Sequence, residues 1–289
     1  MEQGCKITPV LLAGGMGERL RPLTSSASPK PFLRLLSKKS LFQDTVLRSL
    51  PFGLPVIICH ESYLPLVQQQ LTEISVKPRA IILEPDHRGT AAAISLAAFY
   101  LKNLGETMLV LPTDHYLDDR KTFGQTVLRA QQYAQDHIVA LGVVPDRAET
   151  GYGYIEYIPQ SVDADVYKVR GFVEKPDAKL AKDFMRQGTY LWHSGMFMAR
   201  PKTYLTALKK YEPDIFKYAE RAYYAGDDDG KTYSVASEEF LKITSLSVDY
   251  AVLEHLDHAM VTILDAEWGD VGTWPQILRH KVKSMIKRA

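Results

Sequence analysis

The first half of the chain alternates short apolar runs with longer amphipathic stretches. The apolar runs are rich in Val, Ile and Leu and are bounded by Gly, Pro or charged residues, which is typical of buried strands. This alternation predicts a parallel sheet that is covered by helices on both faces. The predicted strands span 9–13, 55–59, 80–84, 107–111 and 138–143, and the predicted helices span about 41–50, 62–74, 90–104 and 121–135.

The pattern changes after about residue 150. Two strand candidates follow each other closely, so we expect an antiparallel pair inserted beside the main sheet. We expect the acidic run DDDG to be a solvated loop, and a late helix to be capped by Ser247. The two strand candidates span 152–158 and 167–174, a last strand spans 261–264, the loop spans 227–230, and helices are predicted at 177–187, 202–224, 247–256 and about 274–288.

Together these patterns predict an α/β fold of the Rossmann-like, doubly wound kind, with a mixed, mainly parallel sheet and a small antiparallel insertion. No repeat or break in composition divides the chain. We therefore expect a single domain over 1–289, with a ligand-binding half over 1–150 and a second half over 151–289 that ends in a helix. Ligands of such sheets bind at the carboxyl ends of the strands.

Composition excludes several classes of function. The 289 residues include 35 Lys and Arg against 34 Asp and Glu, so a net charge of +1 gives no basis for binding nucleic acid or an anionic membrane. No apolar run approaches the roughly 18 residues that span a membrane. Cys5 and Cys59 are too few for a disulfide framework, and we expect no signal peptide before the glycine-rich segment. We expect a cytoplasmic protein.

The strongest candidate site follows the first predicted strand, in residues 11–30 (LLAGGMGERLRPLTSSASPK). Its glycines allow a sharp turn that presents backbone N–H groups to an anion, and its cations suit a polyphosphate. The glycines alone would equally fit an ordinary surface turn. The residues are Gly14, Gly15, Gly17, Arg19, Arg21 and Lys30.

Spacing excludes two familiar phosphate-binding loops. A Walker A loop requires Lys followed by Ser or Thr after GxxxxG, and this segment has no such pair. A dinucleotide fingerprint requires GxGxxG, and its third position is Leu20 here. The segment therefore indicates a phosphate-binding loop of another kind.

The segment resembles the signature of the sugar-1-phosphate nucleotidyltransferases, usually written GGxGxRLxPLTxxxPKP. Later segments match the same family in order, and several of them most resemble its mannose-1-phosphate guanylyltransferases. The longer bacterial members of that group carry a C-terminal sugar-phosphate isomerase domain, which we do not expect in this chain. The matching segments are EP with RGTA (84–91), LPTDH (111–115), TGYGYI (150–155), FVEKP (172–176), WHSGMF (192–197), SVDYAVLE (247–254) and WGDVGTW (268–274).

The resemblance implies a Mg²⁺-dependent transfer of a nucleotidyl group from GTP to mannose 1-phosphate, which gives GDP-mannose and pyrophosphate. Such in-line attack depends on aligning two anionic reactants and neutralising their charge. Two alternatives stay open: UTP or dTTP with glucose 1-phosphate, and a catalytically weak subunit that senses a sugar nucleotide. The two substrates are the expected partners, with no nucleic acid and no membrane, and a homodimer is left open.

The resemblance assigns nucleotide binding to the half over 1–150 and sugar-phosphate binding to the half over 151–289, and it also implies residue roles. Arg19 would hold the β- and γ-phosphates, and Lys30 would reach the α-phosphate. Pro29 and Pro31 fix the backbone around Lys30, which favours a positioned residue over a surface lysine. The nucleotide would be bound by Leu12, Ala13, Gly14, Gly15, Gly17, Glu84, Gly89 and Thr90.

Asp114 and Asp270 would hold the metal by the same resemblance. Mg²⁺ takes one or two protein carboxylates and fills its other positions with phosphates and water. Outside the motif context, Asp114 would fit a helix N-cap and Asp270 an Asx-turn. The sugar phosphate would contact Asp114, Gly153, Glu174, Lys175, His193 and Asp249.

Two positions depart from the guanylyltransferase pattern. Close bacterial relatives usually have RNTA where this chain has RGTA, so Gly89 replaces Asn and leaves the choice of base open. The family usually has WNSGMF, so His193 also replaces Asn. A neutral imidazole has one donor and one acceptor but a different shape and reach, and its charge can change near neutral pH. His193 therefore leaves the sugar specificity open.

Overall fold

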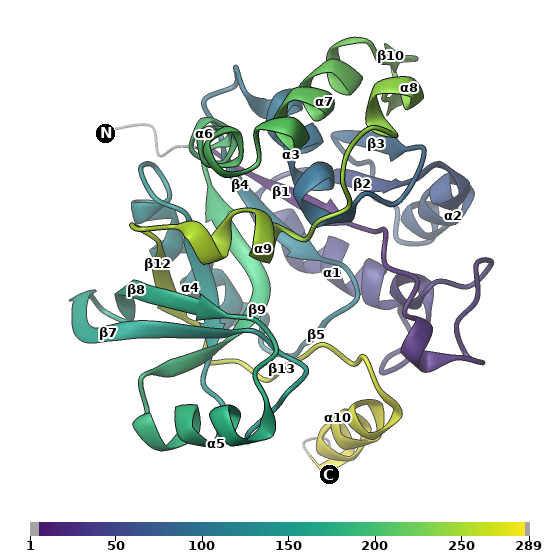
Figure 1. The fold of residues 1–289 in the computed structure, drawn as a ribbon. Coiled ribbons are helices and arrows are strands. Elements are labelled where there is room, and N and C mark those ends of the chain that lie inside the picture. Colours follow the sequence, from purple (N-terminus) through teal and green to yellow (C-terminus); the bar gives the residue numbers. More distant parts are fainter. Residues whose placement is uncertain (1–5, 287–289) are drawn as a thin grey trace.

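The computed structural model describes residues 6–286, with helices on both faces of one large mixed sheet (Figure 1). The sheet order is β10-β11-β3-β2-β1-β4-β9-β6-β12-β8-β7, and β5 pairs separately with β13. The predicted mixed α/β fold is confirmed. The strands are β1 (Ile7–Leu12), β2 (Val56–His60), β3 (Ala80–Glu84), β4 (Thr107–Pro112), β5 (Tyr116–Leu117), β6 (Val139–Val143), β7 (Tyr154–Asp163), β8 (Val166–Val173), β9 (Tyr190–Ala199), β10 (Asp227–Asp228), β11 (Thr232–Ser234), β12 (Met260–Ile263) and β13 (Trp268–Gly269).

Several helices begin where the chain supplies a side-chain cap. Ser40 and Gln43 form a capping box at the start of α1, while Asp119 caps α4 and Asp177 caps α5. The helices are α1 (Leu41–Ser49), α2 (Leu64–Glu73), α3 (Gly89–Leu101), α4 (Arg120–Tyr133), α5 (Ala178–Gln187), α6 (Pro201–Tyr211), α7 (Pro213–Tyr224), α8 (Ser237–Phe240), α9 (Val248–Ala251) and α10 (Trp274–Ile286).

The parallel strands β3, β2, β1 and β4 form the centre of the first half. Val10 of β1 lies opposite Val56 of β2 and Val110 of β4. Val10 packs in the core under α3, α6 and α7, whereas the next residue, Leu11, packs in the core under α1, α2 and α4. Because successive side chains point to opposite faces, a strand buried on both sides is apolar throughout.

Strand β9 joins the two halves of the sheet. It pairs antiparallel with β4, β6 and β7. The strands β6, β12, β8 and β7 are successive neighbours in the sheet, and β7 also pairs with β9. These five strands therefore close around a small core that includes Ile155, Leu191 and Val261. The antiparallel part is therefore larger than the single inserted pair that the sequence predicts.

Three local expectations are corrected. The predicted helix 202–224 is two helices, because Pro213 cannot continue the hydrogen-bond ladder of α6. Ser247 precedes α9 but its side chain makes no cap hydrogen bond; the Val248 N–H donates to Thr90 Oγ1 instead. The expected loop 227–230 contains the short strand β10, which pairs with β11, although both aspartates of β10 are exposed.

Some predicted features lie at the chain ends. Cys5 and the last residues of the predicted tail helix, 287–288, lie outside the described residues. Between residues 6 and 286, no helix is long and apolar enough to cross a membrane.

Candidate active site

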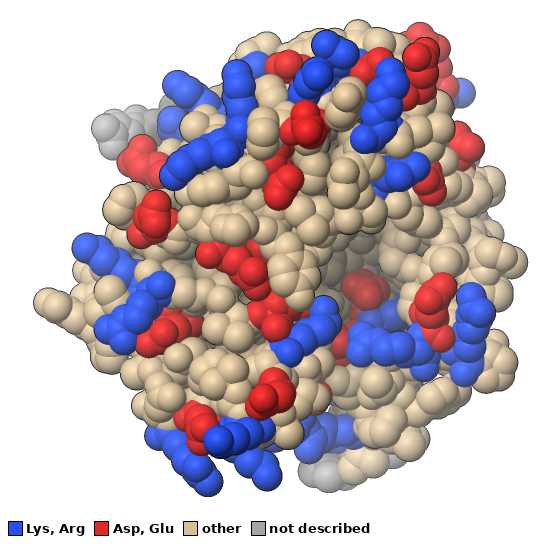
Figure 2. Space-filling view, viewed as in Figure 1, with Lys and Arg blue, Asp and Glu red and all other residues tan. Residues whose placement is uncertain are grey.

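A cavity of about 590 Å³ opens beyond the carboxyl ends of β1, β3 and β4. Figure 2 shows a hollow on the viewed face with acidic and basic side chains around it. Ala13, a predicted nucleotide contact, does not line this cavity; it is fully buried and its N–H donates to the Ile58 carbonyl. The other predicted nucleotide contacts line the cavity, together with two predicted substrate contacts: Leu12, Gly14, Gly15, Gly17, Glu84, Gly89, Thr90, Asp114 and Asp249.

The glycine-rich loop folds back over Lys30. Gly17 has a φ of +72°, and a Cβ at this position would lie 2.5 Å from the Lys30 Cβ. The Lys30 N–H donates to the Met16 carbonyl at 3.3 Å, and Thr24 Oγ1 donates to the Gly17 carbonyl at 2.9 Å. A side chain at position 17 would therefore displace Lys30, so glycine is required for this close approach.

Lys30 is a buried lysine that joins three distant segments. Only 3% of the residue is exposed, which excludes the alternative of a surface lysine. Its Nζ lies 2.8 Å from Asp114 Oδ2 and also donates to the backbone carbonyl of Asp270. Burial alone would raise the pKa of Asp114, but the charge and hydrogen bond of Lys30 outweigh burial and lower that pKa to about 2.

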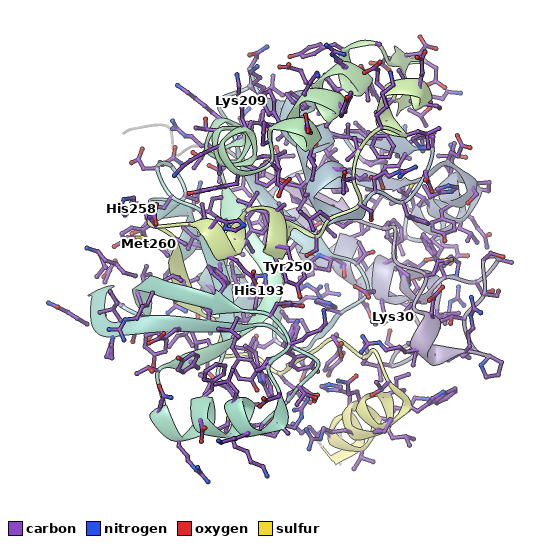
Figure 3. All side chains as sticks on the ribbon, in the orientation of Figure 1. Lys30, His193, Lys209, Tyr250, His258 and Met260 are labelled. Atoms are coloured by element: carbon purple, nitrogen blue, oxygen red, sulfur yellow. The ribbon has the colours of Figure 1, made fainter. Side chains whose placement is uncertain are left out.

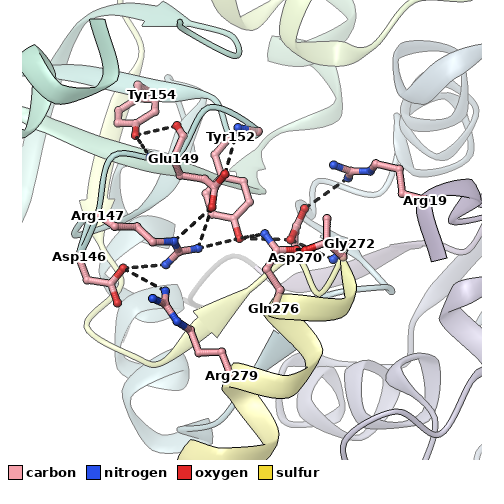
Figure 4. Close-up of polar contacts among 12 residues, drawn as sticks. Arg19, Asp146, Arg147, Glu149, Tyr152, Tyr154, Asp270, Gly272, Gln276 and Arg279 are labelled. Atoms are coloured by element: carbon pink, nitrogen blue, oxygen red, sulfur yellow. Dashed lines mark hydrogen bonds and ion pairs between the residues drawn. The ribbon is translucent and has the colours of Figure 1, made fainter. Parts of the chain in front are cut away.

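Asp270 faces the same site from the turn before α10 (Figure 4). Its Oδ1 accepts hydrogen bonds from the Gly272 N–H at 3.1 Å and from the Tyr152 hydroxyl at 3.2 Å. Its Oδ2 lies 3.6 Å from Arg19 Nη2, whose side chain is 62% exposed. The turn hydrogen bond and the contact with Arg19 therefore coexist, and the guanidinium stays accessible to a ligand.

Tyr152 is a residue of this site that the sequence analysis did not single out. Gln276 Nε2 donates to the Tyr152 hydroxyl at 2.9 Å, so Tyr152 links α10 to Asp270 (Figure 4). The Arg147 guanidinium lies 4.6 Å from the Trp192 ring centroid and borders the Tyr152 ring. Burial, together with Asp270, raises the pKa of Tyr152, so its hydroxyl stays protonated and donates. The only sequence signal is its place in TGYGYI.

The two carboxylates offer the kind of oxygen ligand that Mg²⁺ takes. Asp114 and Asp270 both border Lys30, from the β4 and β13 ends of the site. No group of three or more metal-ligating side chains occurs in the described part of the chain. A cation held by these two residues would complete its shell with water and phosphate oxygens, as Mg²⁺ does in phosphoryl-transfer sites.

The predicted sugar contacts gather beside this cavity. Gly153, Glu174, His193 and Asp249 line a small adjoining cavity. A Cβ at Gly153 would lie 2.5 Å from Glu174 Oε2, and the Gly153 carbonyl accepts from the His193 N–H at 2.8 Å. Lys175 Nζ lies 2.5 Å from Glu174 Oε1 with its side chain 57% exposed. Glycine at position 153 therefore leaves the room that the Glu174 carboxylate occupies.

His193 and Asp249 form a pair at this end of the site. His193 Nε2 lies 3.0 Å from Asp249 Oδ1, and the His193 side chain is only 5% exposed. Burial opposes ionisation of Asp249, but the contact with His193 lowers its pKa, so Asp249 is a carboxylate at neutral pH. Asp249 lines both cavities, which therefore adjoin. Figure 3 shows Lys30 and His193 on opposite sides of the site.

Two further residues, Glu84 and Gly89, line the nucleotide cavity. Glu84 is 4% exposed, its Oε1 has no hydrogen-bond partner among the described residues, and burial raises its pKa to about 8. Gly89 has a φ of +79°, and a Cβ there would overlap the Leu246 carbonyl oxygen. Glycine at position 89, where close bacterial relatives usually have Asn, therefore allows the Leu246 segment to pack closely onto the start of α3.

An α/β sheet with a glycine-rich loop, a buried lysine and two carboxylates at its carboxyl edge defines a protein that binds phosphorylated ligands. The chain matches the nucleotidyl transferase family over residues 8–285. It therefore belongs to that family, as its motifs predict.

Similar proteins agree with this membership. The chain is 42% identical to a mannose-1-phosphate guanylyltransferase of Klebsiella pneumoniae over 275 residues, which cover 93% of this chain and 58% of that protein. A second one, from Salmonella typhimurium, is 43% identical, with 93% and 57% covered. The chain thus spans less than two thirds of these relatives' length.

Solved structures show the same fold. A Thermus thermophilus protein described as a mannose-1-phosphate geranyltransferase matches with a TM-score of 0.84 and 31% identity, covering 95% of this chain and 79% of that one. A UDP-glucose pyrophosphorylase bound to UDP-glucose matches with a TM-score of 0.66 and 16% identity over 98% of this chain and 99% of that one. The second likeness supports the fold alone.

Proposed function

We propose that this chain transfers a guanylyl group from GTP to mannose 1-phosphate, giving GDP-mannose and pyrophosphate. The observation that carries the proposal is the position of Lys30, buried against Asp270 and against Asp114, which lines the larger cavity. The larger cavity takes the nucleotide. The smaller one has room for about one water molecule, so the sugar phosphate is placed over it, against Glu174, His193 and Asp249. The names of the similar proteins support the choice of guanosine and mannose.

In this reaction an oxygen of the sugar phosphate attacks the α-phosphorus of GTP, and the bond from that phosphorus to the bridging oxygen of pyrophosphate breaks. The chain supplies alignment and positive charge rather than a covalent intermediate. Lys30 donates to an α-phosphate oxygen, where charge develops during transfer. Arg19, whose guanidinium is accessible, binds the β- and γ-phosphates and stabilises the leaving pyrophosphate.

Asp114 and Asp270 would hold Mg²⁺, and the bound ion neutralises charge on the phosphates. Lys30 keeps Asp114 ionised by lowering its pKa, and Tyr152 fixes the orientation of the Asp270 carboxylate. The ligand set is therefore charged and oriented by contacts within the protein.

Glu84 offers the base a hydrogen-bond acceptor. Its buried carboxyl has an oxygen without a partner among the described residues, and guanine carries N–H donors on one edge. At the other end, the imidazole of His193 and the carboxylate of Asp249 together offer acceptors and a donor for sugar hydroxyls. A cytoplasmic location and a homodimer stay predictions.

The test is pyrophosphate release with Mg²⁺, in which GTP, ATP, UTP, CTP and dTTP are each combined with mannose 1-phosphate and glucose 1-phosphate. We expect turnover with GTP and mannose 1-phosphate alone. Turnover with UTP or dTTP and glucose 1-phosphate would contradict the proposed substrates but keep the mechanism. Binding of a sugar nucleotide without release from any pair would indicate a sensing subunit instead.

A further inference from the structure

Three ring side chains, Tyr63, His60 and His87, form a cluster beside the nucleotide cavity, and the Tyr63 and His87 ring centroids lie 6.0 Å apart. Tyr63 is 3% exposed and packs edge-on against Phe32. The centroid of the His60 ring lies 5.6 Å from that of Tyr63, and the centroid of the His87 ring lies 4.9 Å from that of His60, at an interplanar angle of 31°. His87 is exposed and lines the cavity. The ring cluster therefore presents the imidazole ring of His87 at the cavity wall.

Hydrogen bonds and an ion pair from neighbouring residues hold parts of the ring cluster in place. Asp86 Oδ1 accepts from the His87 backbone N–H at 2.8 Å, while Asp86 Oδ2 lies 3.0 Å from Arg88 Nη2. His60 Nδ1 lies 2.7 Å from Ser62 Oγ and accepts from the Ser62 N–H. These contacts hold the backbone of His87 and the ring of His60, which lowers the conformational cost of a contact with a ligand.

His87 shares its part of the cavity with Glu84. A Cβ at Gly14 would lie 3.7 Å from His87 Nδ1 and 3.9 Å from Glu84 Oε2, so the ring and the carboxyl border the same stretch of the glycine-rich loop. A flat ring can contact the face of a base, and a carboxyl can accept from its edge. The two side chains thus offer complementary contacts to one nucleobase.

We infer that His87 is a base-binding residue, which packs its imidazole ring against the purine base of the bound nucleoside triphosphate, with His60 and Tyr63 in contact with that ring. This inference rests on the proposed function, because it concerns the nucleotide site of the same reaction. Burial and the neighbouring His60 lower the pKa of His87, so above neutral pH the ring is uncharged and is not a cation for the phosphates.

Calorimetric titration of the whole chain at pH 8 tests this assignment, with GTP and with inorganic tripolyphosphate as a probe that lacks a base. The variants are His87→Ala, His87→Phe and the control His137→Ala, which removes a half-buried histidine outside the cavity whose ring contacts the His258 carbonyl. Since stacking on a ring contributes about 1–3 kcal/mol per base, His87→Ala is expected to raise the Kd for GTP about tenfold, with Phe restoring most of the affinity. The Kd for tripolyphosphate should stay unchanged in every variant.

Two results would overturn the inference: an unchanged Kd for GTP in His87→Ala, or an equal loss of affinity for tripolyphosphate, which would place His87 on the phosphates. If His87→Ala does not fold, His87→Gln, which also lacks the ring, takes its place. A wild-type chain that binds no GTP contradicts the proposed function itself. A wild-type chain that binds GTP as tightly as its His87 variants contradicts only the role of His87.

Discussion

Lys30 Nζ lies 2.8 Å from Asp114 Oδ2, although the two residues are 84 positions apart in the chain. The lysine is buried and the carboxylate lines the nucleotide cavity, so the pair places a fixed charge at the edge of the site. The same ammonium donates to the backbone of Asp270, which connects the glycine-rich loop to the C-terminal part of the chain.

Lys30→Met is expected to lower kcat roughly 100- to 1,000-fold, because removing one positioned donor from a site of developing charge costs that much in other enzymes. Methionine keeps the apolar stem, so the far-UV circular dichroism should be unchanged. The exposed Lys38→Met is the matched control. Turnover of the Lys30 variant close to that of the wild type would remove this residue from the mechanism.

Tyr152→Phe is expected to weaken the metal site, because it removes the hydroxyl that donates to Asp270 Oδ1 while keeping the ring. Loss of such an outer contact costs about 10- to 100-fold in metal affinity in known sites. Mn²⁺ binding measured by electron paramagnetic resonance, together with the Mg²⁺ dependence of turnover, checks this. Tyr157→Phe, whose hydroxyl donates to the Gly188 carbonyl, is the control; equal metal affinity in both variants would rule out the positioning role.

Glu84 gives folding stability a particular dependence on pH. Its pKa is raised from 4.5 to about 8 by burial, so the folded chain holds a proton that the unfolded chain has released between those values. Unfolding therefore releases a proton, and stability falls as pH rises through this window, by at most about 1.4 kcal/mol per pH unit.

Urea unfolding at pH 5, 6.5 and 8 tests that dependence in Glu84→Gln, which cannot ionise. The variant should gain stability relative to the wild type as the pH rises. The exposed Glu61→Gln serves as the comparison. Parallel pH profiles of wild type and Glu84→Gln would show that Glu84 is ionised throughout.

Gly153→Ala is expected to affect the sugar end alone. The added methyl group would lie 2.5 Å from Glu174 Oε2 and must displace that carboxylate. We expect the KM for mannose 1-phosphate to rise about tenfold, equivalent to about 1.4 kcal/mol, with the KM for GTP unchanged. Gly171→Ala, which has open space around its Cβ position, is the control. A rise confined to the KM for GTP would contradict the assignment of the two cavities.

The local pattern of apolar and polar residues was sufficient to predict most of the helices and strands. The continuous apolar runs predict β1, β2, β3, β4 and β6, because strands buried on both faces exclude polar residues. Strand β9 was missed because WHSGMF mixes polar and apolar positions. His193 and Ser194 are buried there, and the Ser194 hydroxyl donates to the Leu141 carbonyl of a neighbouring strand. A strand whose polar groups find partners on other strands has no clear signature of its own.

The sequence by itself determined the family, the parallel half of the sheet and the identity of the candidate residues, because hydrophobic period and motif spacing are local properties of the chain. Only the tertiary structure decided that Lys30 contacts both Asp114 and Asp270, and that Tyr152 joins Asp270 to Gln276 of α10. These contacts join residues up to 240 positions apart. They arise because parallel strands bring their carboxyl ends to one edge of the sheet, where the ammonium of the buried Lys30 can lower the pKa of the Asp114 carboxyl.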